Sequence, residues 1–213
     1  MFKNLEGAIV YDLEADGLLD TISKVHCICW KVLGSKTVQE AYTVDDFLSS
    51  IPSDAVLIGH NCLGFDKIVL ELFASKNYHH EHIDTLILSQ MLYPYRNSHS
   101  LGSYSEEEGI QKVANEDWSV LTDNMLERCK NDVLLTESIF NKMLKAAKAY
   151  KVDWTDSVRL EHDIAEEVGK QSYRGCPINH PLLEQRVELL TNIIKRLGDN
   201  VKQILGTYVR NMG

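Results

Sequence analysis

The sequence has few of the features that mark secreted and membrane proteins. Its five cysteines are too few and too scattered for a disulfide scaffold, and the spacing of Cys27 and Cys29 is typical of a strand, not of a zinc-binding knuckle. No N-terminal segment combines a basic start, an apolar stretch and a small-residue cleavage site, and no apolar run approaches the length of a membrane span. We therefore expect a cytoplasmic protein with reduced thiols that has no contact with a membrane.

Basic residues are also few. The chain has 22 lysines and arginines against 31 aspartates and glutamates, which gives a formal net charge of −9. This balance argues against a protein that holds nucleic acid by a broad basic face, but it is compatible with a nuclease whose acidic site meets phosphate through metal ions. The sequence has no glycine-rich phosphate loop and no nucleophile elbow, so the chemistries that depend on them are not indicated.

The order of hydrophobic patterns predicts an α/β domain with a mixed sheet followed by a helical extension. Strands are expected at 7–14, 24–33, 36–44 and 55–61 and at the start of 82–93; helices are expected at 45–51, 66–75, the end of 82–93, within 98–112, and at 122–149 with Thr122 as N-cap. After Tyr150 two helices joined through Gly175, Cys176 and Pro177 follow without a strand. We therefore expect one domain over 1–150 and a helical extension over 151–213.

Four acidic residues attract attention because they belong to three apolar elements. Alternation along the first strand places Asp12 and Glu14 on one face, although a lone Asp-x-Glu is more often a solvated strand end. Asp66 opens a helix after a buried strand, where an N-cap or first-turn role is an equally good interpretation. Asp132 lies on an apolar helical stripe, and a carboxylate in a core needs a hydrogen-bonded partner, a cation or a metal.

If these four carboxylates converge, their mutual repulsion favours binding of divalent cations. Hard oxygen ligands in this number suit Mg²⁺ or Mn²⁺. Two such ions together activate a water molecule and stabilise the leaving oxygen in phosphodiester cleavage. The acidic residues thus predict a metal-dependent nuclease site.

The segments YDLEADGL, NCLGFD and KNDV resemble, in order and spacing, the three motifs of the DEDD 3′–5′ exonucleases, whose fold is similar to ribonuclease H. The likeness covers most of the chain and is greatest to the proofreading domain of phage-type family A DNA polymerases. The helical tail resembles the segment by which such polymerases pass from the exonuclease to the polymerase domain. The polymerase catalytic motifs themselves are absent from the sequence, so the chain is not expected to polymerise alone.

The resemblance implies a role for each matched residue. Asp12, Glu14, Asp66 and Asp132 match the ligands of two metal ions, Mg²⁺ or Mn²⁺, and Glu14 also helps to orient the attacking water. Leu18 matches an apolar residue that wedges against the terminal base, and Asn61 and Phe65 match substrate contacts, although Leu18 and Phe65 are equally well explained as packing residues. Asp16 is expected to serve the turn beside Gly17.

One position departs from the family pattern. In the tyrosine subclass a tyrosine precedes the last aspartate by four residues, where this chain has Arg128, and the histidine subclass needs a histidine where Glu127 stands. Helical spacing puts Arg128 beside Asp132, and an arginine stabilises phosphate charge but does not act as a base. We therefore include Arg128 among the expected catalytic residues, with a weakened water-orienting function.

Two functions are compatible with these motifs. The first is an enzyme that removes nucleotides from single-stranded or frayed DNA 3′ ends as the proofreading part of a polymerase, with the polymerase domain in the same or a separate chain; an RNA exonuclease is a weaker option. The second is a nuclease fold that is catalytically weakened and serves to hold DNA or to dock a polymerase. The cluster His79, His80 and His82 is expected to be solvated rather than to form a metal site.

Overall fold

The computed structural model describes residues 5–110, 113 and 117–211, and its centre is a five-stranded mixed sheet. The strands are β1 (Ile9–Ala15), β2 (Val25–Val32), β3 (Gln39–Ala41), β4 (Leu57–Gly59) and β5 (His82–Asp84), in the order β3-β2-β1-β4-β5. β1, β2 and β3 are antiparallel neighbours, whereas β4 is parallel to β1 and β5 is parallel to β4. The predicted mixed sheet is confirmed.

The third strand is shorter than the sequence predicts. Of its three residues only Ala41 is buried, so the segment lacks the apolar face that would support a longer strand. The chain then turns at Thr43, whose side chain accepts a hydrogen bond from the Asp46 N–H and caps the next helix. The competing N-cap therefore ends the segment for which the sequence predicts a strand over 36–44.

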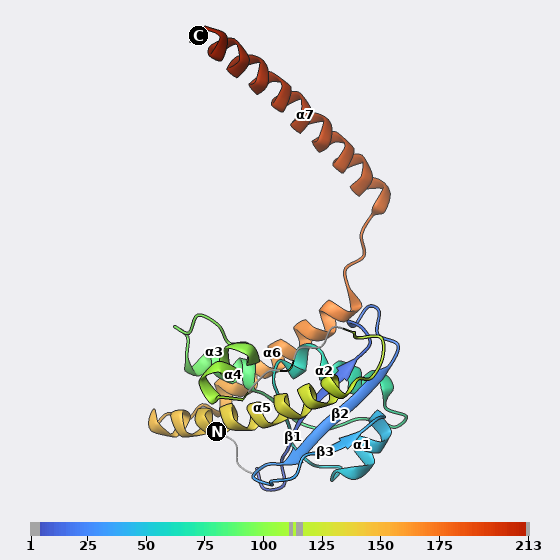
Figure 1. The fold of residues 1–213 in the computed structure, drawn as a ribbon, viewed down its shortest axis with the longest axis vertical. Helices are drawn as coiled ribbons and strands as arrows, with labels where there is room; N and C mark the ends of the chain where they lie inside the picture. Colours follow the sequence, from blue (N-terminus) through green and yellow to red (C-terminus); the bar gives the residue numbers. More distant parts are fainter. Residues whose placement is uncertain (1–4, 111–112, 114–116, 212–213) are drawn as a thin grey trace. The chain divides into compact units, whose positions relative to one another are not determined.

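Helices cover both faces of the sheet. They are α1 (Val44–Ser50), α2 (Asp66–Phe73), α3 (Thr85–Leu92), α4 (Leu101–Glu108), α5 (Asp123–Ala149), α6 (Thr155–Arg174) and α7 (His180–Asn211), with a 3₁₀ turn, η1, at Cys62–Gly64. One apolar cluster joins Val10 of the sheet to α3, α4 and α5, and the other joins Tyr11 to α1 and α2. Because Val10 and Tyr11 are adjacent in β1, the two clusters lie on opposite faces. Figure 1 shows α5 running along β1 and β2.

The long helix α5 forms as predicted. Thr122 is its N-cap, and the Met125 N–H donates to Thr122 Oγ1 at 3.1 Å. The predicted stripe is buried over its whole length, and it consists of Met125, Cys129, Asp132, Val133, Thr136, Phe140 and Met143. The helix therefore carries Asp132 into the interface with the sheet.

The chain divides into two compact units, Met1–Arg174 and Gly175–Gly213. The first unit includes α6, which lies in the segment after residue 150 that the sequence predicts as part of the extension. His162 of α6 accepts a hydrogen bond from the Asp84 N–H at 2.9 Å through Nε2 and donates to the Val158 carbonyl at 2.8 Å through Nδ1. Both ring nitrogens of this buried imidazole are hydrogen-bonded, and the bond to Asp84 attaches α6 to β5. The compact unit therefore includes α6 and ends at residue 174.

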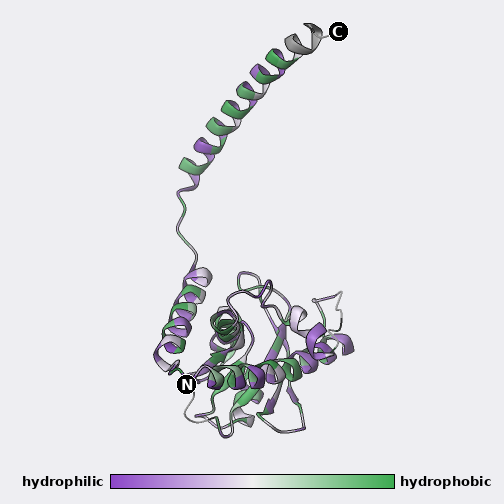
Figure 2. Ribbon diagram, turned by 90° about the vertical axis from the view of Figure 1, so that its left-hand side faces the viewer, coloured by the Kyte–Doolittle hydropathy of each residue, from purple (hydrophilic) through white to green (hydrophobic). Residues whose placement is uncertain are grey.

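The second unit consists mainly of α7, on which apolar and polar residues alternate along the helix (Figure 2). Within the residues that the structure describes, no helix combines the length and apolarity needed to cross a membrane. All five cysteines are free thiols.

Candidate active site

Three of the predicted carboxylates meet between β1 and α5. Asp12, Glu14 and Asp132 each offer an oxygen, and these oxygens lie within 4.8 Å of one another. Strand alternation aims Asp12 and Glu14 at α5, and the buried stripe of α5 aims Asp132 back at the strand. Glu14 and Asp132 are buried and Asp12 is partly exposed, so the group is open to solvent on one side.

Asp66, the fourth predicted carboxylate, is buried at the first position of α2. Burial raises its pKa well above the usual range, and the charges of Asp84 and Glu14 raise it further. Burial likewise raises the pKa of Asp12, followed by the charges of Asp132, Glu14 and Asp66. The fold therefore brings all four carboxylates into electrostatic contact, and a cation at this point would relieve the cost of ionising them.

Asp84 fixes the turn that leads to Asp66, and sequence patterns did not single it out. Its carboxylate accepts backbone N–H groups from Asn61 at 2.8 Å, Leu63 at 3.2 Å and Leu86 at 2.9 Å. Asn61 adopts the left-handed conformation, with φ of 58°, at the start of this turn. The available sequence signal was the position of Asp84 as N-cap of α3, but its partners in the preceding turn are distant in sequence.

Arg128 lies against the acidic group. Its Nε is 3.2 Å from Glu14 Oε1 and 3.9 Å from Asp132 Oδ2, so it contacts Asp132 as the sequence predicts and Glu14 in addition. Its guanidinium carbon lies 5.4 Å from the centre of the Trp118 ring. A permanent positive charge therefore stands beside two of the four carboxylates.

A cavity of about 480 Å³ opens beside Glu14. It is lined by Leu13, Glu14, Ala15, Gly17, Leu18, Thr21, Phe65 and Trp118. Leu18 is 72% exposed, so it does not serve as a core residue. Asn61 is exposed in the turn before α2 and is not among the lining residues. The structure thus brings Leu18 and Phe65 to one cavity, but not Asn61.

The loop that carries Leu18 is held by Asp16. Asp16 Oδ2 accepts a hydrogen bond from the Ser23 hydroxyl at 2.5 Å, and Asp16 Oδ1 accepts the N–H groups of Ser23 and Lys24, each at 2.9 Å. These bonds, that of the Ser23 hydroxyl foremost, lower the pKa of Asp16 to about 2. The predicted turn role of Asp16 is confirmed. An exposed leucine on a loop closed in this way is presented to solvent beside the acidic group.

Trp118 is a further residue of this cavity, and the sequence motifs do not assign it to the site. Its carbonyl accepts a hydrogen bond from His26 Nε2 at 2.9 Å, which fixes its segment to β2. A tryptophan in the polar segment EDWS is a signal for a surface contact. The cavity that it lines could not be predicted, because most of the other lining residues lie about a hundred positions earlier in the chain. Trp118 and Leu18 give this acidic site an apolar wall.

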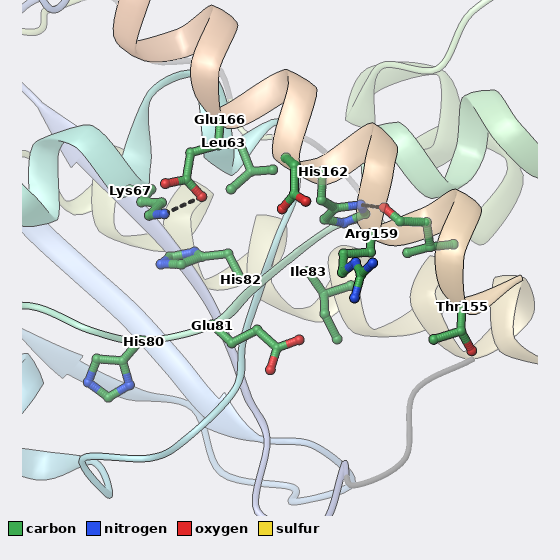
Figure 3. A pocket seen from close by; sticks show the side chains of 12 residues that line it. Leu63, Lys67, His80, Glu81, His82, Ile83, Thr155, Arg159, His162 and Glu166 are labelled. Atoms are coloured by element: carbon green, nitrogen blue, oxygen red, sulfur yellow. Dashed lines mark hydrogen bonds and ion pairs between the residues drawn. The ribbon is translucent and has the colours of Figure 1, made fainter.

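A second cavity, of about 240 Å³, lies between α6 and β5 and contains none of the predicted site residues (Figure 3). Lys67 pairs there with Glu166 at 2.5 Å. The expectation of a solvated histidine cluster is wrong for His82, which is buried in β5 with Nδ1 3.2 Å from Tyr11 Oη and with Nε2 in contact with the Tyr78 hydroxyl. Burial lowers the pKa of His82 well below the usual range, because the surrounding aromatic core disfavours a charged imidazole.

The sequence of the chain is similar to those of known phage proteins. The chain is 22% identical over 94% of its length to the DNA-directed DNA polymerase of Escherichia phage T7, and 22% identical over 89% to that of Enterobacteria phage T3. It spans about 37% of the length of each of these relatives. No protein-family model matches the chain.

Solved structures share the fold. Brucella melitensis NrnC superimposes with a TM-score of 0.62 at 16% identity, over 81% of this chain and 89% of that one. Escherichia coli RNase D, described as an exoribonuclease involved in structured RNA processing, superimposes with a TM-score of 0.54 at 16% identity, over 75% of this chain and 45% of that one. The chain is therefore a relative of the phage DNA polymerases that has the ribonuclease H-like fold of the DEDD exonucleases, as its three motifs predict.

Proposed function

We propose that the chain is a metal-dependent 3′–5′ exonuclease that hydrolyses the terminal phosphodiester bond of DNA. The observation that carries this proposal is the convergence of Asp12, Glu14 and Asp132, with Asp66 in electrostatic contact, beside an apolar cavity. Carboxylates hold metal in such sites, and an apolar slot accepts a nucleobase. Both parts of a terminal nucleotide, its phosphate and its base, thus have chemically suitable partners next to each other.

The residues suit divalent metal ions. Carboxylate oxygens are the hard ligands that Mg²⁺ and Mn²⁺ prefer. The pKa values of Asp12 and Asp66 are raised because their negative charges are buried close to other carboxylates, and a bound cation would compensate this negative charge. A related fold, that of Brucella melitensis NrnC, has been solved with bound Mg²⁺. When bound by Asp12, Glu14, Asp66 and Asp132, two such ions would supply an activated water and stabilise the leaving oxygen.

The protein side chains would position the substrate. Leu18 and Trp118 contact the terminal base, and Phe65 closes the same cavity at the start of α2. Glu14 orients the attacking water, and Arg128 contacts the scissile phosphate once Glu14 and Asp132 have other cationic partners. Asn61 contacts the strand from the exposed turn before α2.

Digestion of a 5′-labelled single strand tests the proposal. We expect Mg²⁺ or Mn²⁺ to support stepwise shortening from the 3′ end, EDTA to stop it, and the double variant Asp12→Ala, Glu14→Ala to abolish it. Asp54→Asn is the control, because it also removes a carboxylate, but an exposed one outside the acidic site: Asp54 precedes β4, whereas the site residue Asp66 follows β4. Substantial metal-dependent cleavage by the double variant would refute the assignment. An RNA strand of the same sequence, run in parallel, tests the preference for DNA.

The proposed biological setting is proofreading for a phage-type DNA polymerase. The relatives are polymerases of which this chain spans about 37%, and their exonuclease part would act on a strand end released by the polymerase part. We infer that the polymerase domain, in the same or a separate chain, is the partner of this exonuclease. Coupled assays of this chain with the polymerase domain, using a mismatched primer end, test this setting.

A second function is favoured by one observation, the ion pairs of Arg128 with Glu14 and Asp132. A fixed guanidinium supplies part of the charge that metal would otherwise supply, and a chain that relies on it would hold DNA without cleaving it. Binding of a single strand that is unchanged by EDTA, with no shortening in either Mg²⁺ or Mn²⁺, would support this DNA-holding module over the exonuclease.

A further inference from the structure

Three buried cysteines form a cluster of their own next to the acidic site. Cys27 and Cys29 lie on β2 and Cys129 on α5, and each is 0% exposed. Their Sγ atoms lie within 4.8 Å of one another. Three thiols that converge from two elements are an arrangement that can bind a soft ion, since thiolates are the softest ligands in proteins.

The cluster is joined directly to the acidic residues. In the β1–β2 pairing Asp12 stands opposite Cys29, and Glu14 stands opposite Cys27. Cys129 Sγ donates a hydrogen bond to the Asp12 carbonyl at 3.3 Å. Cysteine in a core often serves only as a small apolar residue, and such a role predicts no affinity for any ion.

We propose that Cys27, Cys29 and Cys129 form a binding site for a trivalent thiophilic ion of the arsenite class. The first reason is ligand number. Structural zinc is held by four ligands, whereas this group among the described residues has three, the number that As(III) takes.

The second reason is charge. Three thiolates around a divalent ion leave a net negative charge in the core beside ionisable Asp12, which is costly, whereas three thiolates around As(III) form a neutral complex. In the binding reaction arsenous acid loses its three hydroxyl groups and three As–S bonds replace three As–O bonds. Each thiol proton leaves with one hydroxyl as water, so three waters form and no oxidation state changes.

Refolding of the full chain in sodium arsenite with a phosphine reductant tests the site, because the ion then meets the thiols before they are buried. After removal of free arsenite, native mass spectrometry should find one arsenic per chain, and arsenic X-ray absorption should find three sulfur neighbours and no oxygen. Excess Mg²⁺ should not displace the arsenic, which separates this site from the carboxylates.

Substitutions locate the site. Cys29→Ser and Cys129→Ser should lose the retained arsenic, while Cys62→Ser, buried outside the cluster, and Cys176→Ser, exposed, should keep it. No retained arsenic in the wild type, an oxygen neighbour in its absorption spectrum, or loss of arsenic in Cys176→Ser would each overturn the proposal. The absorption spectrum of the wild type decides the question even if the Cys129 variant does not fold.

Discussion

At the scale of single residues, Arg128 is the position where this chain departs most clearly from the DEDD pattern. Its guanidinium engages Glu14, the residue expected to orient the attacking water, and it cannot itself accept a proton. We predict that Arg128→Tyr hydrolyses a single-stranded end at least about tenfold faster than the wild type, because a positioned general base contributes about 10²–10⁴-fold. Single-turnover rates measure this, with Arg128→Lys as the control that keeps the charge and should stay slow. A wild-type rate equal to that of Arg128→Tyr would make Arg128 an effective substitute.

Asp12 gives a prediction for stability in the absence of metal. Because its pKa is raised in the folded state, charging it destabilises the fold, and stability is lost as pH rises from the usual aspartate pKa of about 4 toward the raised value. In EDTA at neutral pH, Asp12→Asn should be more stable than the wild type by about 1 kcal/mol or more. Below pH 4 both forms carry a neutral side chain, so urea unfolding should give nearly equal stabilities there. A variant less stable than the wild type at neutral pH would contradict the repulsion argument.

Trp118 gives a prediction for substrate binding. If a base stacks against its ring, Trp118→Ala should weaken binding of a single-stranded 3′ end by about 1–3 kcal/mol, with little dependence on the base. Trp118→Phe keeps an aromatic face and should recover most of the affinity. Fluorescence anisotropy in Ca²⁺, at fixed salt, measures both; equal affinity of the alanine variant and the wild type would remove Trp118 from the site.

At the scale of elements, local pattern was enough for the order of strands and helices and for the direction of Asp12, Glu14 and Asp132, but not for the length of β3 or for the direction of Asp66. The period of β1 places Asp12 and Glu14 on one face, and the stripe of α5 buries Asp132. The contacts that were missed join segments far apart in sequence: Asp84 to the turn at Asn61, and Arg128 to Glu14. No periodicity records such pairs, because they depend on strand order and on which helix covers which strand.

The packing of α6 on the turn before Asp66 gives a prediction at this scale. A Cβ on Gly169 would lie 2.7 Å from the Leu63 carbonyl, so Gly169→Ala should destabilise the compact unit by about 1–3 kcal/mol and slow cleavage by shifting the turn. Gly198→Ala in α7 is the matched control: no atom lies within 4 Å of its added Cβ, and the helix should gain about 1 kcal/mol. Urea unfolding and far-ultraviolet circular dichroism measure the pair, and an unperturbed Gly169→Ala would mean that α6 does not approach the turn closely.

At the scale of the whole molecule, the boundary at residue 174 separates two kinds of surface. The compact unit buries the apolar faces of its sheet and helices in two clusters. Most apolar residues of α7 whose side chains the structure describes, up to Leu205, are exposed within the second unit. An apolar helix face of this length is rarely left in contact with water, so the exposed face of α7 indicates a binding surface for other helices.

The stripe on α7 recurs at alternating spacings of four and three, and it comprises Leu183, Val187, Leu190, Ile194, Leu197, Val201 and Ile204, each between 45% and 69% exposed. We predict that helices of a polymerase domain or of another chain cover this stripe. The double substitution Leu190→Glu, Ile194→Glu should abolish association with the purified polymerase domain, and any self-association, while leaving the melting temperature of the compact unit and its cleavage of single strands unchanged. Asn192→Glu, a change at an exposed polar position of α7 outside the stripe, should have no effect on either. Light scattering and limited proteolysis complete the test: a strictly monomeric chain whose α7 already resists protease would mean that the stripe packs on its own molecule, and the docking prediction would be wrong.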